Sequence, residues 1–167
     1  MTYRTSIGTE WFNMMGARHL EIRIVNKAMD APLKDFFVEL ATGGDEIFFH
    51  PHPFTRQEAT KRANYDGKDL YYVLVGNGEI LGYGMLRGWD EGYEIPSLGI
   101  AIRSSYRGRG LGILLMNFLH AAAKMRGASR IRLKVNSENI TAIRLYEKLG
   151  YKFVGEEKGE LIGLVDI

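Results

Sequence analysis

The chain has 167 residues, of which 46% are hydrophobic and 25% are charged, and its formal net charge is +2. This length fits one globular domain of about 100–200 residues, so we expect residues 1–167 to form one domain, with a loose segment over residues 1–16. The absence of cysteine excludes disulfide scaffolds, thiolate metal sites and a cysteine nucleophile. No apolar run reaches the ~18 residues of a membrane span, and no apolar signal core follows the first residues. We therefore expect a cytoplasmic protein that does not bind membranes.

Glycine and charge are unevenly distributed. The chain has 20 glycines, about 12% of its residues against a usual ~7%. No Asp or Glu occurs from residue 95 to residue 137, whereas the remainder of the chain is acidic on balance. The basic residues of this segment are Arg103, Arg107, Arg109, Lys124, Arg126, Arg130, Arg132 and Lys134. Such a segment suggests an anionic ligand at one place, although a solvated basic face gives the same pattern.

Hydrophobic periodicity predicts alternating strands and helices. A period of two indicates a half-buried strand, and a period near 3.6 indicates a helix with one buried face. The expected elements, in chain order, are a strand over 19–25, helices over 31–41 and 55–64, strands over 70–75, 80–87 and 93–102, a helix over 111–126, a strand over 131–135, a helix over 139–149, and strands over 151–154 and 161–165. This order indicates an α/β (α+β) fold with a mixed sheet and helices on both faces.

Proline and glycine interrupt several of these elements. Residues 76–78, Gly-Asn-Gly, predict a hairpin turn. Pro96 lies inside the strand expected over 93–102, and because proline cannot donate to a ladder, a bulge or an opening of the sheet is expected there. Gly82 and Gly84 lie within another strand, where either a close ligand or a bulge would explain them.

The strongest candidate site is the segment from residue 102 to residue 112, where a predicted strand leads through alternate glycines into an amphipathic helix. The glycines are Gly108, Gly110 and Gly112. Such glycines let a ligand approach the backbone, and the helix N-terminus adds about half a positive charge. Arg107 and Arg109 add guanidinium groups. We therefore expect a pyrophosphate cradle, which is neither a Walker A loop nor a dinucleotide fingerprint.

Two motifs resemble those of the GCN5-related N-acetyltransferase (GNAT) superfamily. Arg107-x-x-Gly110-x-Gly112 is similar to its acetyl-CoA motif, (Q/R)-x-x-G-x-(G/A). Residues 139–151, with the pattern N-x-x-A-x-x-L-Y-E-K-x-G-Y, are similar to its second motif. The resemblance covers about residues 94–154. It implies a mixed, mostly antiparallel central sheet of about six to seven strands, flanked by about four helices and splayed at the acetyl-CoA site.

The resemblance also implies direct acetyl transfer from acetyl-CoA to a primary amine, with no covalent enzyme intermediate and no metal. The cofactor-binding residues that it implies are Ile100, Ala101, Ile102, Arg107, Gly108, Arg109, Gly110, Leu111, Gly112, Asn139 and Tyr146. The acceptor is left open among small amines, amino sugars, amino acids and protein N-termini. Dimers are common in the family, so a homodimer is compatible with the sequence.

Catalysis of this reaction needs a base and an acid. An ammonium group must lose a proton before it attacks a thioester, and a carboxylate can accept that proton directly or through water. The resemblance implies Glu94 as this base, with Asp90 and Glu91 as competitors. It implies Tyr146 as the acid that protonates the departing thiolate. A strand N–H near Ile100 is expected to hold the oxyanion.

The acceptor pocket is expected to lie in the N-terminal half, where aromatic residues are frequent. The residues assigned to this pocket are His50, His52, Phe54 and Trp89, with Phe48, Phe49 and Tyr93 as further aromatic walls. A packed turn over residues 50–54 is the alternative. Although the spacing of the two histidines suits a metal, the chain lacks cysteine and nearby carboxylates are few, so no metal is expected.

Two other classes of protein are compatible with parts of this pattern. One is an acetyl-CoA-binding sensor with the same fold and no turnover. The other is a nucleic-acid-binding protein, which would show a basic stripe interleaved with exposed aromatic residues. The basic residues instead cluster around one glycine loop, so no nucleic-acid partner is expected.

Overall fold

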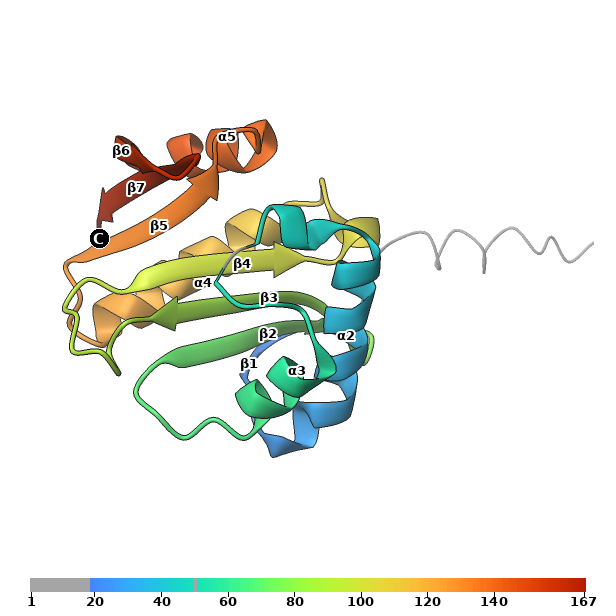
Figure 1. Ribbon diagram of the computed structural model, residues 1–167. Coiled ribbons are helices and arrows are strands. Elements are labelled where there is room, and N and C mark those ends of the chain that lie inside the picture. Colours follow the sequence, from blue (N-terminus) through green and yellow to red (C-terminus); the bar gives the residue numbers. More distant parts are fainter. Residues whose placement is uncertain (1–18, 50) are drawn as a thin grey trace, which may run out of the picture.

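The computed structural model describes residues 19–49 and 51–167 (Figure 1). Its strands are β1 (Leu20–Ile24), β2 (Leu70–Gly76), β3 (Glu79–Arg87), β4 (Ser97–Ile102), β5 (Arg130–Asn136), β6 (Lys152–Glu157) and β7 (Glu160–Asp166). Its α-helices are α2 (Asp30–Thr42), α3 (Arg56–Ala63), α4 (Leu111–Met125) and α5 (Ile140–Lys148). Short 3-10 helices, which the sequence did not predict, are η1 (Lys27–Met29), η2 (Asp45–Ile47) and η3 (Ser104–Tyr106). The expected loose segment over residues 1–16 lies outside the described residues.

The strands form one open sheet with the order β1-β2-β3-β4-β5-β7-β6. Every neighbouring pair is antiparallel except β4 and β5, which are parallel. In the described structure β4 and β5 share one pair of residues, Ser97 with Arg132, and they diverge beyond it (Figure 1). The predicted mixed, mostly antiparallel sheet with one splayed strand pair is therefore confirmed.

Helices cover both faces of this sheet. Figure 1 shows α2 and α3 in front of the sheet and α4 behind it. Phe36, Phe37 and Leu40 of α2 are almost fully buried in the core of the first face. On the second face, α4 packs with β5 and α5, and Leu115 and Leu119 are inaccessible to solvent. The apolar stripe of α4 thus makes the contact that its helical period predicts.

Pro96 does not interrupt a strand. The strand expected over 93–102 begins only at Ser97, and residues 93–95 are exposed and irregular. Pro96 directly precedes β4, where its carbonyl accepts a hydrogen bond of 3.0 Å from the Arg132 N–H. Of the two alternatives expected at Pro96, a bulge inside the strand is not found, because a residue without an N–H is accommodated best where the ladder ends. The other alternative, an opening of the sheet, is present, since β4 and β5 diverge directly after Ser97.

Gly82 and Gly84 provide space for packing rather than for a ligand. A Cβ on Gly84 would lie 2.9 Å from Leu119 Cδ1, and one on Gly82 would lie 2.8 Å from Ile102 Cδ1. The pairing of β2 with β3 also shifts register beside Gly82, as expected for a bulge. These glycines therefore let α4 and its neighbouring side chains approach the sheet closely.

Candidate functional site

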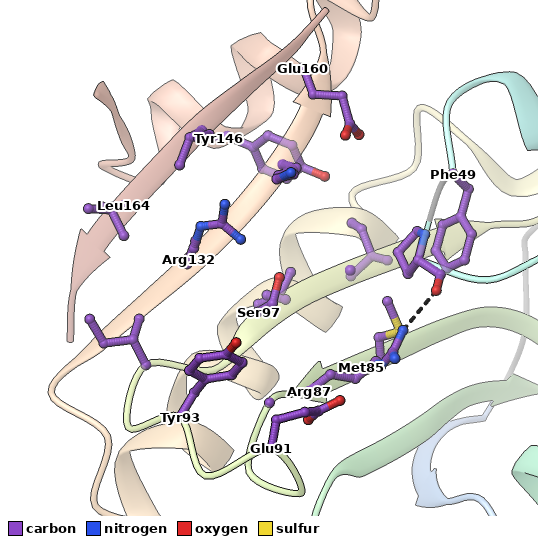
Figure 2. A pocket seen from close by; sticks show the side chains of 18 of the residues that line it. Phe49, Met85, Arg87, Glu91, Tyr93, Ser97, Arg132, Tyr146, Glu160 and Leu164 are labelled. Atoms are coloured by element: carbon purple, nitrogen blue, oxygen red, sulfur yellow. Dashed lines mark hydrogen bonds between the residues drawn. The ribbon is translucent and has the colours of Figure 1, made fainter. Parts of the chain in front are cut away.

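A cleft of about 1130 Å³ lies where β4 and β5 diverge (Figure 2). One wall is formed by β3, β4, the residues Phe48, Phe49 and Pro51, and the turn that precedes β4. The opposite wall is formed by β5 and β7, together with Tyr146 of α5. Neighbouring strands of a sheet normally close such a gap with ladder hydrogen bonds, so the divergence of the two strands creates the cleft.

The open edge of β4 includes the strand residues assigned to the cofactor. On the side of β3, Ile100, Ala101 and Ile102 pair with Gly84, Tyr83 and Gly82. Beyond Ser97, β5 supplies no ladder partner in the described structure. The backbone groups of β4 that point toward β5 are therefore available to a ligand with amide groups of its own.

The glycine loop lies beyond the C-terminal end of β4. Gly108 and Gly110 have φ angles of +72° and +81°, and Gly110 caps α4 without a side-chain hydrogen bond. A Cβ on either glycine would meet no atom within 4 Å, so the left-handed backbone, not crowding, favours glycine here. Because the first N–H groups of a helix lack intrahelical acceptors, those of Leu111 and Gly112 remain available to an anion.

The two arginines of this loop have different partners. Arg107 Nε donates to the Ile102 carbonyl at 2.9 Å, and its terminal nitrogen donates to Asp45 at 2.6 Å. The Arg107 N–H also donates to Ser104, at 3.3 Å. Arg109 is exposed and lies over the Tyr106 ring, 5.0 Å from its centroid. Arg107 therefore braces the loop, whereas Arg109 presents its guanidinium to solvent.

Tyr146 and Asn139 lie on and before α5. Tyr146 is 7% exposed and lines the cleft, and burial raises the pKa of its phenol to about 12. The phenol therefore stays protonated across the neutral range and is available as a proton donor. Asn139 caps α5, because its side-chain oxygen accepts from the Ala142 N–H at 3.2 Å. The amide nitrogen of Asn139 has two donors that this cap does not use.

The turn before β4 contributes carboxylates to the cleft. Glu91 and Glu94 are both exposed and both line it, although Glu94 lies before the strand on which the sequence placed it. Asp90 is engaged elsewhere: Tyr65 donates to its carboxylate, as does the Lys68 N–H at 2.8 Å. The hydrogen bond from Tyr65, followed by that from Lys68, lowers the pKa of Asp90.

The buried carboxylate of Asp69 holds this turn. One of its oxygens accepts hydrogen bonds of 2.9 Å from the N–H groups of both Gly88 and Trp89. Asp69 is only 6% exposed. Because a buried acceptor of this kind fixes the groups that donate to it, Asp69 positions the turn that carries Glu91 and Glu94.

The residues assigned to the acceptor pocket are not brought together. His52 is buried among aromatic rings: its Nδ1–H donates to the Pro53 carbonyl at 3.0 Å and its Nε2 accepts from the Tyr83 hydroxyl at 3.1 Å. Burial lowers the pKa of His52 to about 4, so the ring is neutral. Phe54 is 2% exposed and stacks on Phe49, with 4.5 Å between ring centroids. Both side chains belong to the core beneath the cleft, and His50 lies outside the described residues.

Trp89 also lies away from the cleft. Its ring is covered by the Arg126 guanidinium at 4.7 Å, and it lines a separate hollow. The aromatic walls of the cleft are instead Phe48, Phe49 and Tyr93, which the sequence had included only as further candidates. Phe48 and Tyr93 are exposed at the cleft, whereas Phe49 is a core residue with one edge at the cleft surface.

Charged residues of the cleft were missed at the sequence level. Arg87, Arg132, Lys134 and Glu160 all line it. The alternation of β5 contained the signal, because Ile131 and Leu133 are buried on the face toward α4 and residues 132 and 134 must point the opposite way. Which neighbour that opposite face meets is decided only by the order of strands in the sheet.

Within residues 19–49 and 51–167, no three His, Cys, Asp or Glu side chains are grouped so that they could hold a metal ion. No helix in this part of the chain is long and apolar enough to cross a membrane.

The splayed sheet and the glycine loop are features of an acetyltransferase-type fold. Comparison of the sequence with known protein families gives the same class. A family model described as the acetyltransferase (GNAT) family matches residues 35–151, and this chain belongs to that family. An acetyltransferase of Pectobacterium atrosepticum is 34% identical over 94 residues, which are 56% of this chain and 64% of that protein. The chain thus matches less than two thirds of the length of this relative.

Solved structures share the fold. The GNAT domain of the S. lividans protein PAT superposes with a TM-score of 0.77 at 16% identity, covering 89% of this chain and 90% of that one. An N-acetyltransferase from Thermoplasma acidophilum, solved with coenzyme A, superposes with a TM-score of 0.73 at 15% identity, covering 89% and 99% of the two chains. At these identities the similarity concerns the fold alone.

Proposed function

We propose that this chain is an N-acetyltransferase that moves an acetyl group from acetyl-CoA directly to a primary amine. The observation that carries this proposal is the divergence of β4 and β5 beyond Ser97 and Arg132, with the free amino end of α4 just past the open end of the gap. A thioester with an amide-bearing arm and a pyrophosphate matches both features.

The residues present fit such a ligand. The unpaired edge of β4 at residues 100–102 would bind the amides of the pantetheine arm. The amino end of α4 with the left-handed glycines Gly108 and Gly110 would bind the pyrophosphate, and Arg109 would add a cation. The structurally similar Thermoplasma acidophilum enzyme was solved with coenzyme A, which supports this choice. Acetyl-CoA would supply the activated acyl group and the thiolate leaving group.

The base is proposed among the carboxylates of the turn before β4. Glu94 and Glu91 both line the cleft, and an exposed carboxylate accepts a proton from an ammonium through ordered water. Asp90 is less suitable, because hydrogen bonds from Tyr65 and Lys68 occupy its oxygens. We assign Glu94 as the base and keep Glu91 as its competitor.

The acid is proposed to be Tyr146. Its phenol lines the cleft and, with a pKa of about 12, remains protonated at the pH at which an amine is attacked. A thiol with an ordinary pKa near ~8.5 is a better leaving group when it receives a proton as it departs. Tyr146 would donate that proton, while a β4 N–H near Ile100 would stabilise the oxyanion.

Thiol release tests this function. Purified protein is mixed with acetyl-CoA and a panel of primary amines, and free CoA thiol is followed with a thiol reagent. Release that requires both acetyl-CoA and an amine is expected, as is acetylated amine in equal amount by mass spectrometry. If acetyl-CoA binds and no amine in the panel releases thiol, the acetyltransferase assignment fails and a non-catalytic acetyl-CoA sensor replaces it.

We further propose that residues 1–167 form a single domain, that the protein is a cytoplasmic homodimer, and that it has neither a nucleic-acid nor a membrane partner. Sedimentation of the purified chain would measure its oligomeric state.

A further inference from the structure

Arg132 lines the cleft and has no side-chain partner among the described residues. It is half buried on β5, and no described residue forms a hydrogen bond or an ion pair with its guanidinium. Figure 2 shows its side chain extending from β5 into the cleft, on the same wall as Tyr146. The pKa of the exposed Glu157 is lowered mainly by Lys134, and to a smaller extent by Lys158 and Arg132. A partly desolvated guanidinium with unused donors favours an anion as its ligand.

The other cations of the cleft are already engaged. Lys134 Nζ donates to Glu157 at 2.8 Å. Arg87 donates to the Pro51 carbonyl at 2.8 Å, and its Nε lies 4.0 Å from the Asp69 carboxylate. Among the three basic residues that line the cleft, Arg132 is therefore the one with a full set of donors available.

The position of Arg132 separates it from the proposed pyrophosphate site. Its backbone is fixed at the closed end of the gap, by the pair with Ser97 and by the hydrogen bond to Pro96. The glycine loop follows the other end of β4, after Ile102. Five steps of about 3.3 Å along an extended strand separate the two ends by roughly 16 Å. An anion at Arg132 would therefore belong to the acceptor.

We propose that the acceptor carries an anionic group, a carboxylate or a phosphate, in addition to its amine, and that Arg132 binds this group. The inference rests on the proposed acetyltransferase function and specifies its substrate class. The opposite wall carries Glu91 and Glu94, which suit the ammonium end of the same molecule. Each wall also carries one residue of the other sign: Glu160 of β7 lies on the wall of Arg132, and Arg87 of β3 lies on the wall of the two glutamates, where the Pro51 carbonyl and Asp69 engage it. A zwitterionic acceptor is oriented when its anionic end meets Arg132 and its ammonium end meets Glu91 and Glu94. Arg132 fixes the anionic end, and the amine is then directed toward Tyr146 and the open edge of β4.

Matched pairs of acceptors test this inference. L-alanine is compared with L-alaninamide, and glucosamine 6-phosphate with glucosamine, so that the two arms distinguish a carboxylate from a phosphate. In at least one pair, the anionic member is expected to have a KM about 10- to 100-fold lower than its neutral partner, as for a charge-assisted hydrogen bond. Arg132→Gln should abolish that difference without changing the KM of acetyl-CoA, and Arg132→Lys should restore part of it.

Arg130→Gln is the control variant. It removes the same charge from the same strand, but Arg130 pairs with Asp166 and does not line the cleft. Its KM values should equal those of the wild type. Circular dichroism and thermal unfolding of each variant establish that it is folded. An equal effect of Arg132→Gln on anionic and neutral acceptors would contradict the inference while leaving the acetyltransferase function intact.

Binding provides a readout that does not need turnover. Isothermal titration calorimetry of the same four probes is performed on protein saturated with CoA. Tighter binding of an anionic probe by the wild type, lost in Arg132→Gln, supports the inference even if no probe is acetylated. If neither anionic probe binds more tightly than its neutral partner, the inference is overturned.

Discussion

Ser97 and Arg132 form the single residue pair that joins β4 to β5 in the described structure. The Arg132 N–H also donates to Pro96, which directly precedes β4. Proline has no N–H of its own, and β4 and β5 diverge directly beyond this point. The Ser97–Arg132 pair is therefore the closed end of the gap between the two strands. The cleft, the free edge of β4 and the unpartnered guanidinium of Arg132 all follow from this relationship.

Replacement of Tyr146, the proposed acid, should lower the catalytic rate, whereas replacement of the neighbouring Tyr151 should lower only the stability. Tyr146→Phe is expected to lower kcat by about 100-fold or more, by the same factor at pH 7 and pH 9, because the phenol remains protonated up to a pH of about 12. Tyr151→Phe is the control: its hydroxyl is hydrogen-bonded to His120 Nε2 at 2.9 Å, so it should lose about 1 kcal/mol of stability with kcat unchanged. An unaltered kcat in Tyr146→Phe would remove Tyr146 from the mechanism. Stopped assays and urea titrations supply both values.

The assignment of the base predicts a difference between two neighbouring carboxylates. Glu94→Gln should lower kcat/KM by about 100-fold near neutral pH, and less at high pH, where the free amine is already abundant. Glu91→Gln, a matched change in the same turn, should change kcat by less than about threefold, because Glu91 is expected to contribute to acceptor binding and not to proton removal. Profiles of kcat/KM against pH for both variants check this. The reverse order of effects would transfer the role to Glu91.

Replacement of Gly110 should impair acetyl-CoA binding, whereas replacement of Gly84 should reduce only the stability of the fold. Gly110→Ala forces a side chain into the left-handed region, which costs about 1 kcal/mol, and is expected to raise the KM of acetyl-CoA by about 10-fold. Gly84→Ala crowds Leu119 instead and should cost roughly 1–3 kcal/mol of stability, with the KM of acetyl-CoA unchanged. Urea unfolding and initial rates on both variants would test the assignment. An unchanged KM in Gly110→Ala would argue against a pyrophosphate at this loop.

Asp69 should act on the acceptor through the turn that it holds. Asp69→Ala leaves the N–H groups of Gly88 and Trp89 without their acceptor and should cost about 1–3 kcal/mol. The KM of the amine should rise, because Glu91 and Glu94 lose their fixed position. The exposed Asp66→Ala is the comparison and should alter neither value. A stability loss with an unchanged KM would make Asp69 purely structural.

His52 should make stability depend on pH. Its pKa is lowered from 6.5 to about 4 by burial, so the unfolded chain binds the proton more readily than the folded chain does. The contribution of neutral His52 to the free energy of unfolding is fully present above pH 6.5. It is lost as the pH falls toward 4, where the loss amounts to roughly 3 kcal/mol. Urea titrations from pH 7.5 to pH 4 should show a shallower decline for His52→Gln. The exposed His19→Gln serves as the control, and equal slopes in wild type and His52→Gln would refute this account.

Local signals predicted much of the fold. Alternation in β5, the apolar stripe of α4 and the Gly-Asn-Gly hairpin each involve neighbours within a few residues, so they are readable along the chain. The ends were less certain: β4 begins at Ser97 rather than at residue 93, because Pro96 stops the ladder. The glycine loop also has the left-handed conformation that its alternate glycines suggested.

The acceptor side could not be read in the same way. His52, Phe54 and Trp89 are aromatic side chains in a loop and a turn, and nothing local distinguishes a core ring from a pocket wall. The burial of His52 and Phe54 depends on α2 and β3, which pack against them from elsewhere in the chain. Trp89 packs instead with the cluster on the face of α4 and is covered by Arg126. Arg132 looked like one more basic residue of its segment, because its role depends on which strands flank β5.

By itself, the sequence determined the order and kind of the elements, the glycine loop with its arginines, and the family motifs, since each is written in residues that are neighbours along the chain. Only the tertiary structure shows that, in the described residues, β4 and β5 pair at Ser97 and Arg132 alone. It also shows which side chains face the resulting gap and which are buried in the core. The physical reason is that burial and charge pairing are set by contacts between residues far apart in sequence. The sequence of one strand does not indicate where its neighbour in the sheet will diverge from it.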